Sequence, residues 1–219
     1  MSLTLIIGNK NYSSWSLRAW LMLKQAGVAF EEIRVPLDTP ETADRLRSYS
    51  PSAKVPVLKA GALTIWESIA IGEYIAEQFP EAQLLPQDSA VRAIVRSVSA
   101  EMHAGFAALR QKMPMDCRSR YPGRGMTSAV QRDIDRITTL WRDCRQQYGS
   151  SGDFLFGHFT LADAMYAPVV SRFVTYDVAL EPMAQAYADT IWRLPAMQEW
   201  VSAAAIEPET LSETLLFGG

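Results

Sequence analysis

Cysteine and histidine are both scarce in this chain. Its 219 residues include two cysteines, Cys117 and Cys144, and two histidines, and no Cys-x-x-Cys pair occurs. We therefore expect no disulfide framework, no bound metal and no dithiol redox chemistry. Both thiols are expected to stay reduced.

The chain also lacks a strong excess of one charge and any long apolar run. The net charge of −3 argues against a polyanion as partner, so we expect no nucleic-acid binding. No apolar run reaches 18 residues, and the segment LTLII has no basic lead-in and ends at Gly8. We accordingly expect a cytoplasmic protein with no membrane partner.

The hydrophobic pattern divides the chain into two parts. Through residue 79, β-rich runs and amphipathic stretches follow the order β-α-β-α-β-β-α, whereas almost everything after residue 88 has helical periodicity. Residues 80–88 contain two prolines and no periodicity, which indicates a linker. We predict an α/β domain over 1–79, a linker over 80–88 and an all-helical domain over 89–219.

Within the second part, residues 89–113 are predicted to form one helix and residues 126–149 another. The basic turn CRSRYPGRG between them is interpreted as a solvated loop, with an anion or partner site as the alternative. Thr160 stands three residues before Asp163 at the start of an apolar run, which predicts a capping box.

Serines cluster where the first predicted strand passes into a helix. Ser13, Ser14 and Ser16 occupy this junction, and Ser68 opens a later helix. Serine before a helix is usually a cap, but free N–H groups at a helix start also attract anions. The joint placement indicates a site for a small acidic ligand, with a carboxylate at Ser68 and a second group near Ser13.

Four ordered segments resemble the glutathione transferases: SSWSLRAWLMLKQAG, SPSAKVPVL, LTIWESIAIGEYIAE and FTLADAMYAPV. The first is similar to the serine signature of the zeta class. This resemblance covers nearly the whole chain. It implies a thioredoxin-like βαβ-α-ββα N-terminal domain, an all-helical C-terminal domain, glutathione as co-substrate and a homodimer.

The resemblance also implies roles for individual residues. Ser13 would donate a hydrogen bond to the glutathione sulfur and stabilise the thiolate, with Ser14 as the second choice and Ser16 and Tyr12 as further alternatives. Pro56 would follow a cis peptide bond and hold Val55 against the cysteinyl part of the tripeptide. The remaining glutathione contacts would come from Glu67 at the γ-glutamyl amine, Ser68 at its carboxylate, and Lys54, with Lys10 as a further candidate, at the glycine carboxylate.

The second substrate is expected between Ser13 and the first helices of the second domain. The candidate pocket residues are Tyr12, Trp15, Met102, His103, Phe106 and Arg110. Arg110 and Arg172 are candidates for an acidic substrate group. The sequence departs from the zeta pattern at Trp15, where that class has cysteine, and at Glu67, where it has glutamine.

We therefore expect a glutathione transferase whose thiolate attacks a small, hydrophobic electrophile. One alternative is a glutathione-dependent cis-trans isomerase of the maleylacetoacetate type. The other alternative is a binding protein that keeps the fold without turnover.

Overall fold

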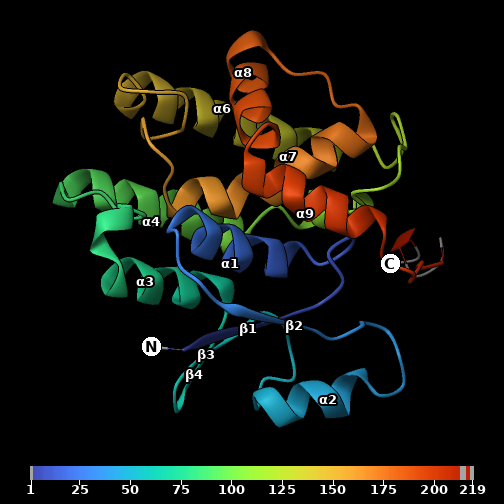
Figure 1. Cartoon of the computed structure of the whole chain (residues 1–219). Coiled ribbons are helices and arrows are strands. Elements are labelled where there is room, and N and C mark those ends of the chain that lie inside the picture. The colour runs from blue at the N-terminus through green and yellow to red at the C-terminus, as the bar shows by residue number, and fades with distance from the viewer. Residues whose placement is uncertain (1, 213–215, 218–219) are drawn as a thin grey trace.

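A computed structural model describes residues 2–212 and 216–217 of the chain. Its N-terminal part contains a sheet of four strands, β1 (Leu3–Ile7), β2 (Glu31–Arg34), β3 (Val57–Ala60) and β4 (Leu63–Trp66), in the order β2-β1-β3-β4 (Figure 1). Strand β1 pairs parallel with β2 and antiparallel with β3, and β3 pairs antiparallel with β4. Helix α1 (Ser14–Gln25) makes the crossover that a parallel pair requires.

Alternation along the strands gives the sheet two buried faces. Leu5, Ile7 and Leu58 point into the large core shared with α1 and α3 (Ser68–Gln78). Ile6 and Val57 point the other way and pack with Leu46 of α2 (Thr42–Tyr49). In Figure 1, α1 therefore lies between the sheet and the helical part, and α2 covers the far face of the sheet.

The second part consists of helices arranged around a buried one. After the short 3-10 turn η1 (Pro80–Ala82) come α4 (Ser89–Ala104), α5 (Ala107–Lys112), α6 (Ser128–Tyr148), α7 (Leu161–Tyr176), α8 (Pro182–Trp192) and α9 (Pro195–Ala205). Helix α7 is buried along almost its whole length and packs against α1, α4 and α8. This arrangement confirms the predicted fold class.

The single helix predicted over residues 89–113 is wrong in one respect. The structure breaks it into α4 and α5 at Gly105 and Phe106, and Phe106 has a left-handed φ of 59°. Met102, Leu109 and Met113 are nevertheless all buried. The apolar stripe thus continues across the break, so periodicity alone could not detect it.

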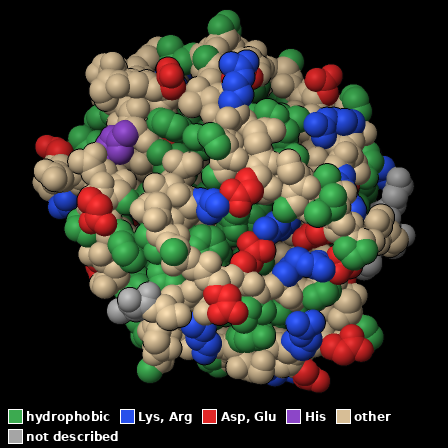
Figure 2. Space-filling view, in the orientation of Figure 1, with side chains coloured by type: hydrophobic (Ala, Val, Ile, Leu, Met, Phe, Trp, Pro, Cys, Tyr) green, Lys and Arg blue, Asp and Glu red, His purple; other side chains and the backbone are tan. Residues whose placement is uncertain are grey.

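Residues 80–88, the predicted linker, run against the helical part. Leu84 is buried, and its carbonyl accepts a hydrogen bond from the Leu161 N–H at 2.8 Å. Among the described helices, none is long and apolar enough to cross a membrane. On the face seen in Figure 2, basic and acidic side chains are interspersed rather than segregated by sign.

Candidate active site

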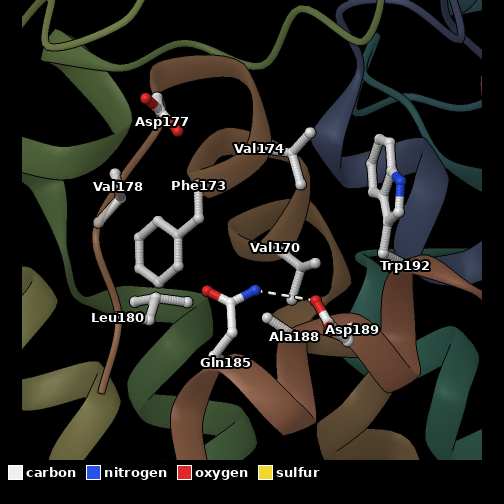
Figure 3. Close-up of a pocket in the computed structure, with 10 residues that line it drawn as sticks. All are labelled: Val170, Phe173, Val174, Asp177, Val178, Leu180, Gln185, Ala188, Asp189 and Trp192. Carbon is white, nitrogen blue, oxygen red and sulfur yellow. Dashed lines mark hydrogen bonds between the residues drawn. The ribbon is translucent and has the colours of Figure 1, made fainter. Parts of the chain in front are cut away.

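Two adjoining cavities contain most of the residues predicted for the site. The first cavity has a volume of about 350 Å³ and the second about 530 Å³, and Trp15, Lys54 and Val55 line both. Glu67 and His103 line only the first cavity, whereas Ser13 and Arg110 line only the second. A third cavity of about 230 Å³ lies between α7 and α8 and contains none of the predicted site residues (Figure 3).

Ser13 is both the cap of α1 and a wall of the second cavity. Its hydroxyl oxygen accepts from the Ser16 N–H at 3.3 Å and lies 2.7 Å from the Ser16 hydroxyl. The Ser16 hydroxyl oxygen in turn accepts from the Gly8 N–H at 3.0 Å. These contacts fix the Ser13 side chain at the junction of β1 and α1, where it is nearly buried.

Ser14 occupies the first position of α1 and also lines the second cavity. The guanidinium of Arg172 approaches its hydroxyl oxygen at 3.5 Å. The two serines therefore have different neighbours, because Ser13 contacts the start of its own helix and Ser14 contacts α7.

The first cavity brings together four of the residues predicted to hold a peptide, Lys54, Val55, Pro56 and Glu67. The Val55–Pro56 peptide bond is cis. Glu67 has a φ of 69°, a region that costs about 1–3 kcal/mol for a residue other than glycine and often marks a functional position. Ser68 follows Glu67 directly and begins α3; it lines neither cavity, and its hydroxyl is fully buried and has no hydrogen-bond partner among the described residues.

His103 lies at the edge of the first cavity. Its Nε2 is 3.5 Å from a carboxylate oxygen of Glu67, and its ring meets that of Trp15 edge-on at 5.1 Å. Burial lowers the pKa of His103, and Arg18 and Arg110 lower it further, whereas Glu67 raises it. The imidazole is therefore held toward its neutral form.

The second cavity is lined by two guanidiniums, those of Arg110 and Arg172, and by one carboxylate, that of Asp38. Arg172 is almost fully buried and donates to the carbonyls of Met113 at 2.8 Å and Pro168 at 3.2 Å. Arg110 donates to the carbonyls of His103 at 3.2 Å and Gly105 at 2.6 Å. Burial, with Arg110 as the next cause, lowers the pKa of Arg172 to about 10. An anion would be favoured in this cavity because it would offset these charges.

A third guanidinium, that of Arg18, lies beneath Trp15; Arg18 is the arginine of the zeta-like serine signature, and the sequence assigned it no role in the site. Arg18 is fully buried and donates from Nε to the carbonyl of Met165 at 3.2 Å, while both terminal nitrogens have no hydrogen-bond partner among the described residues. Burial, and then Arg172 and Arg110, hold the pKa of Arg18 well below its usual range. The sequence signal was its fixed distance from Ser13 in the zeta-like signature.

The structure does not bring every predicted residue to the cavities. Met102, within α4, and Phe106, at the turn after it, are buried in the main core and line neither cavity. The Tyr12 ring lines the second cavity, but its hydroxyl oxygen already accepts from Arg118 at 3.0 Å and from the Leu211 N–H at 3.1 Å. Lys10 pairs with Glu32 at 2.9 Å, away from both cavities.

The basic turn after α5 acts as a structural connection. Arg118 donates to the carbonyls of Glu207 and Glu209, each at 2.7 Å, and so fastens the segment after α9. Within residues 2–212 and 216–217, no cluster of three or more His, Cys, Asp and Glu side chains could hold a metal ion.

Comparison with known proteins agrees with this geometry. Residues 12–78 match the family described as glutathione S-transferase, N-terminal domain, and residues 98–203 match its C-terminal domain. A probable maleylacetoacetate isomerase of Caenorhabditis elegans is 31% identical over 77% of this chain and 78% of its own. The maleylacetoacetate isomerase of Rattus norvegicus is 28% identical over 77% of both chains.

Solved structures give the same result. A Burkholderia glutathione transferase homologue with bound glutathione superposes with a TM-score of 0.69 at 25% identity, over 93% of this chain and 98% of its own. A bacterial zeta-class maleyl pyruvate isomerase shares the fold with a TM-score of 0.72 at 24% identity, over 95% of this chain and 100% of its own. The predicted resemblance is confirmed: the chain belongs to the glutathione S-transferase family.

Proposed function

We propose that the protein binds glutathione in the first cavity and activates its thiol at the Ser13 side of the second. Glutathione carries one amine and two carboxylates, and the first cavity is lined by side chains of both charges, the carboxylate of Glu67 and the ammonium group of Lys54. The Glu67 carboxylate would hold the γ-glutamyl amine, the unpaired Ser68 hydroxyl at the start of α3 would hold the adjacent carboxylate, and Lys54 would hold the glycine carboxylate.

The hydroxyl of Ser13 is the best candidate to stabilise the thiolate. The Gly8 N–H already donates to Ser16, so the Ser16 hydroxyl can give its proton to Ser13 across the 2.7 Å contact. With the Ser16 N–H also donating, both lone pairs of the Ser13 oxygen are occupied and its own proton is left for the sulfur. Ser14 remains the second candidate, because Arg172 polarises its hydroxyl.

Thiol activation by about two pKa units would change the reactive fraction substantially. A free thiol near pKa 8.5 is only about 3% ionised at pH 7, whereas one near 6.5 is about three-quarters ionised. This shift corresponds to about 2.7 kcal/mol of preference for the thiolate, the range that one or two charge-assisted hydrogen bonds supply.

The charge of the second cavity favours an unsaturated carboxylate as the second substrate. Arg110 and Arg172 donate hydrogen bonds to neutral oxygens, so their charges are available to a carboxylate. In the isomerase reaction, the thiolate adds to a carbon–carbon double bond conjugated with a carbonyl, whose oxygen takes the electron pair as an enolate. Rotation about the resulting single bond and collapse of the enolate expel the thiolate and release the trans isomer. Glutathione is regenerated.

These observations favour glutathione-dependent cis-trans isomerisation over conjugation of a purely hydrophobic electrophile. The names of the two isomerase relatives support the same choice. From the family resemblance we also propose a cytoplasmic homodimer. The observation that carries the proposal is the placement of two serine hydroxyls and two guanidiniums around one cavity.

The test combines a thiol titration with a substrate comparison. The pKa of bound glutathione, followed by thiolate absorbance, should lie well below 8.5 and return toward that value in Ser13→Ala. Arg172→Gln should lower kcat/KM for a cis-unsaturated dicarboxylate by at least about tenfold, while activity with an uncharged chlorodinitrobenzene changes much less. An unshifted thiol pKa in the wild type would refute thiol activation, and equal losses on both substrates would refute the anionic substrate class.

A further inference from the structure

The loop that presents Ser13 is fastened from the opposite end of the chain. Residues 8–13 connect β1 to α1, and the N–H groups of Lys10 and Asn11 within it donate to the carboxylate of Glu207 at 2.7 and 3.1 Å. Glu207 follows α9 directly and is only 8% exposed. One buried carboxylate thus binds two successive peptide N–H groups shortly before the proposed thiolate donor.

Further contacts bind the same loop to the same segment. The Trp200 indole N–H of α9 donates to the Lys10 carbonyl at 2.8 Å, and the Leu211 N–H donates to the Tyr12 hydroxyl at 3.1 Å. Inside the loop, the Ser13 N–H donates to the Asn9 carbonyl at 2.8 Å. A displacement of the Lys10 and Asn11 peptide units would therefore be transmitted to Ser13.

We propose that Glu207 is a positioning residue for thiol activation, an inference that depends on the proposed function of Ser13. Hydrogen bonds from N–H groups to an ionised carboxylate are shorter and stronger than neutral ones, so Glu207 holds this loop more firmly than an uncharged partner would. Glu207 lines neither of the two cavities. It acts through the loop, because a hydroxyl that stabilises a thiolate must lie within a few tenths of an ångström of its correct position.

Glu209 provides a matched control on the same segment. Its carboxylate pairs with Arg34 at 2.9 Å, and the same guanidinium lies 3.7 Å from Glu207. Glu209→Gln therefore removes the same charge from the same segment but leaves the two loop hydrogen bonds in place. Glu207→Gln keeps the size of the side chain but presents an NH₂ group to one of the two loop N–H groups.

The experiment measures the pKa of glutathione bound to the wild type, Glu207→Gln, Glu209→Gln and Ser13→Ala, together with kcat and KM for glutathione. We expect the thiol pKa to rise by about one unit and kcat to fall at least about tenfold in Glu207→Gln, with KM for glutathione within about twofold of the wild type. Glu209→Gln should match the wild type. Thermal unfolding of each variant accompanies the titration, and Glu207→Asp, whose shorter carboxylate reaches the loop less well, replaces Glu207→Gln if that variant does not fold.

The outcomes separate the two proposals. A thiol pKa that rises in Ser13→Ala but not in Glu207→Gln or Glu207→Asp overturns the role of Glu207 and leaves that of Ser13 intact. Equal rises in Glu207→Gln and Glu209→Gln also overturn it, because charge rather than loop position would then be the cause. A thiol pKa near the free value in the wild type removes the proposed function itself, and with it the role of Glu207.

Discussion

At the scale of single residues, Trp15 is the feature that distinguishes this site from the zeta pattern. Its ring lines both cavities, with the guanidinium carbons of Arg18 and Arg110 at 4.3 and 5.2 Å from the ring centre. Contacts of this kind contribute about 0.5–2 kcal/mol each and so fix the indole as the wall between the two cavities.

Replacing this wall should change the choice of substrate. Trp15→Cys removes the indole, and we expect it to join the two cavities and to raise the preference for bulky over small electrophiles at least about tenfold, measured as the ratio of their kcat/KM values. Trp66→Cys is the control, because Trp66 lines only the first cavity. The same shift in both variants, or none in either, would contradict the assignment of Trp15.

Some residues of the candidate site could be predicted from the sequence because of where they lie along the chain. Ser13, Val55, Glu67 and Ser68 lie at strand ends and helix starts, and such junctions have local sequence signals. Arg18 belongs to the zeta-like signature, but only the fold reveals that its guanidinium is fully buried near those of Arg172 and Arg110.

At the scale of the helix, the start of α7 is held in place by hydrogen bonds to one side chain in its first turn, Asp163. The Asp163 carboxylate accepts from the N–H and hydroxyl of Thr160 at 2.8 and 2.9 Å, from the Leu155 N–H at 3.2 Å and from the Tyr187 hydroxyl at 3.0 Å. The predicted capping box forms, and the same side chain also binds the preceding loop and α8. Burial raises the pKa of Asp163 to about 6, and these hydrogen bonds oppose the rise.

Asp163→Asn should therefore destabilise the protein. The NH₂ group that replaces one carboxylate oxygen faces donors, and leaving buried donors unpaired costs about 1–3 kcal/mol for each group. We expect the free energy of unfolding in urea to fall by about 3 kcal/mol at about pH 8, where the wild-type carboxylate is ionised. Asp189→Asn on the surface of α8 is the control and should change it by less than about 0.5 kcal/mol. Similar losses in the two variants would contradict the role of Asp163.

The break between α4 and α5 marks the limit of sequence prediction at this scale. Gly105 is a sequence feature that could indicate the break, and the structure shows why glycine suits this position: a Cβ would lie 2.7 Å from the Glu101 carbonyl oxygen. The apolar periodicity continues past Gly105, however, and therefore predicts a single helix. The break also helps to position Arg110 at the second cavity, because the Gly105 carbonyl accepts a hydrogen bond from its guanidinium at 2.6 Å.

At the scale of the whole molecule, the site is a product of contact between the two parts of the chain. Arg18 comes from α1 and Arg172 from α7, and these helices pack against each other across the boundary (Figure 1). The family resemblance predicted the α/β part, the helical part and their order along the chain. It could not predict that the guanidiniums of Arg18 and Arg172 lie close together, because this depends on side-chain directions across the interface between α1 and α7.

Gly72 of α3 makes this interface possible. A Cβ at this position would lie 2.6 Å from the sulfur of Met22 in α1 and closer still to Leu161 in α7. Gly72→Ala should therefore lower the free energy of unfolding in urea by about 1–3 kcal/mol, because the added methyl group overpacks three helices at once. Leu161→Val removes volume at the same point, so the double variant should lose less stability than the sum of the two single losses. Strict additivity would show that the crowding at Gly72 is relieved elsewhere, and that α3 is not held against α7 at this residue.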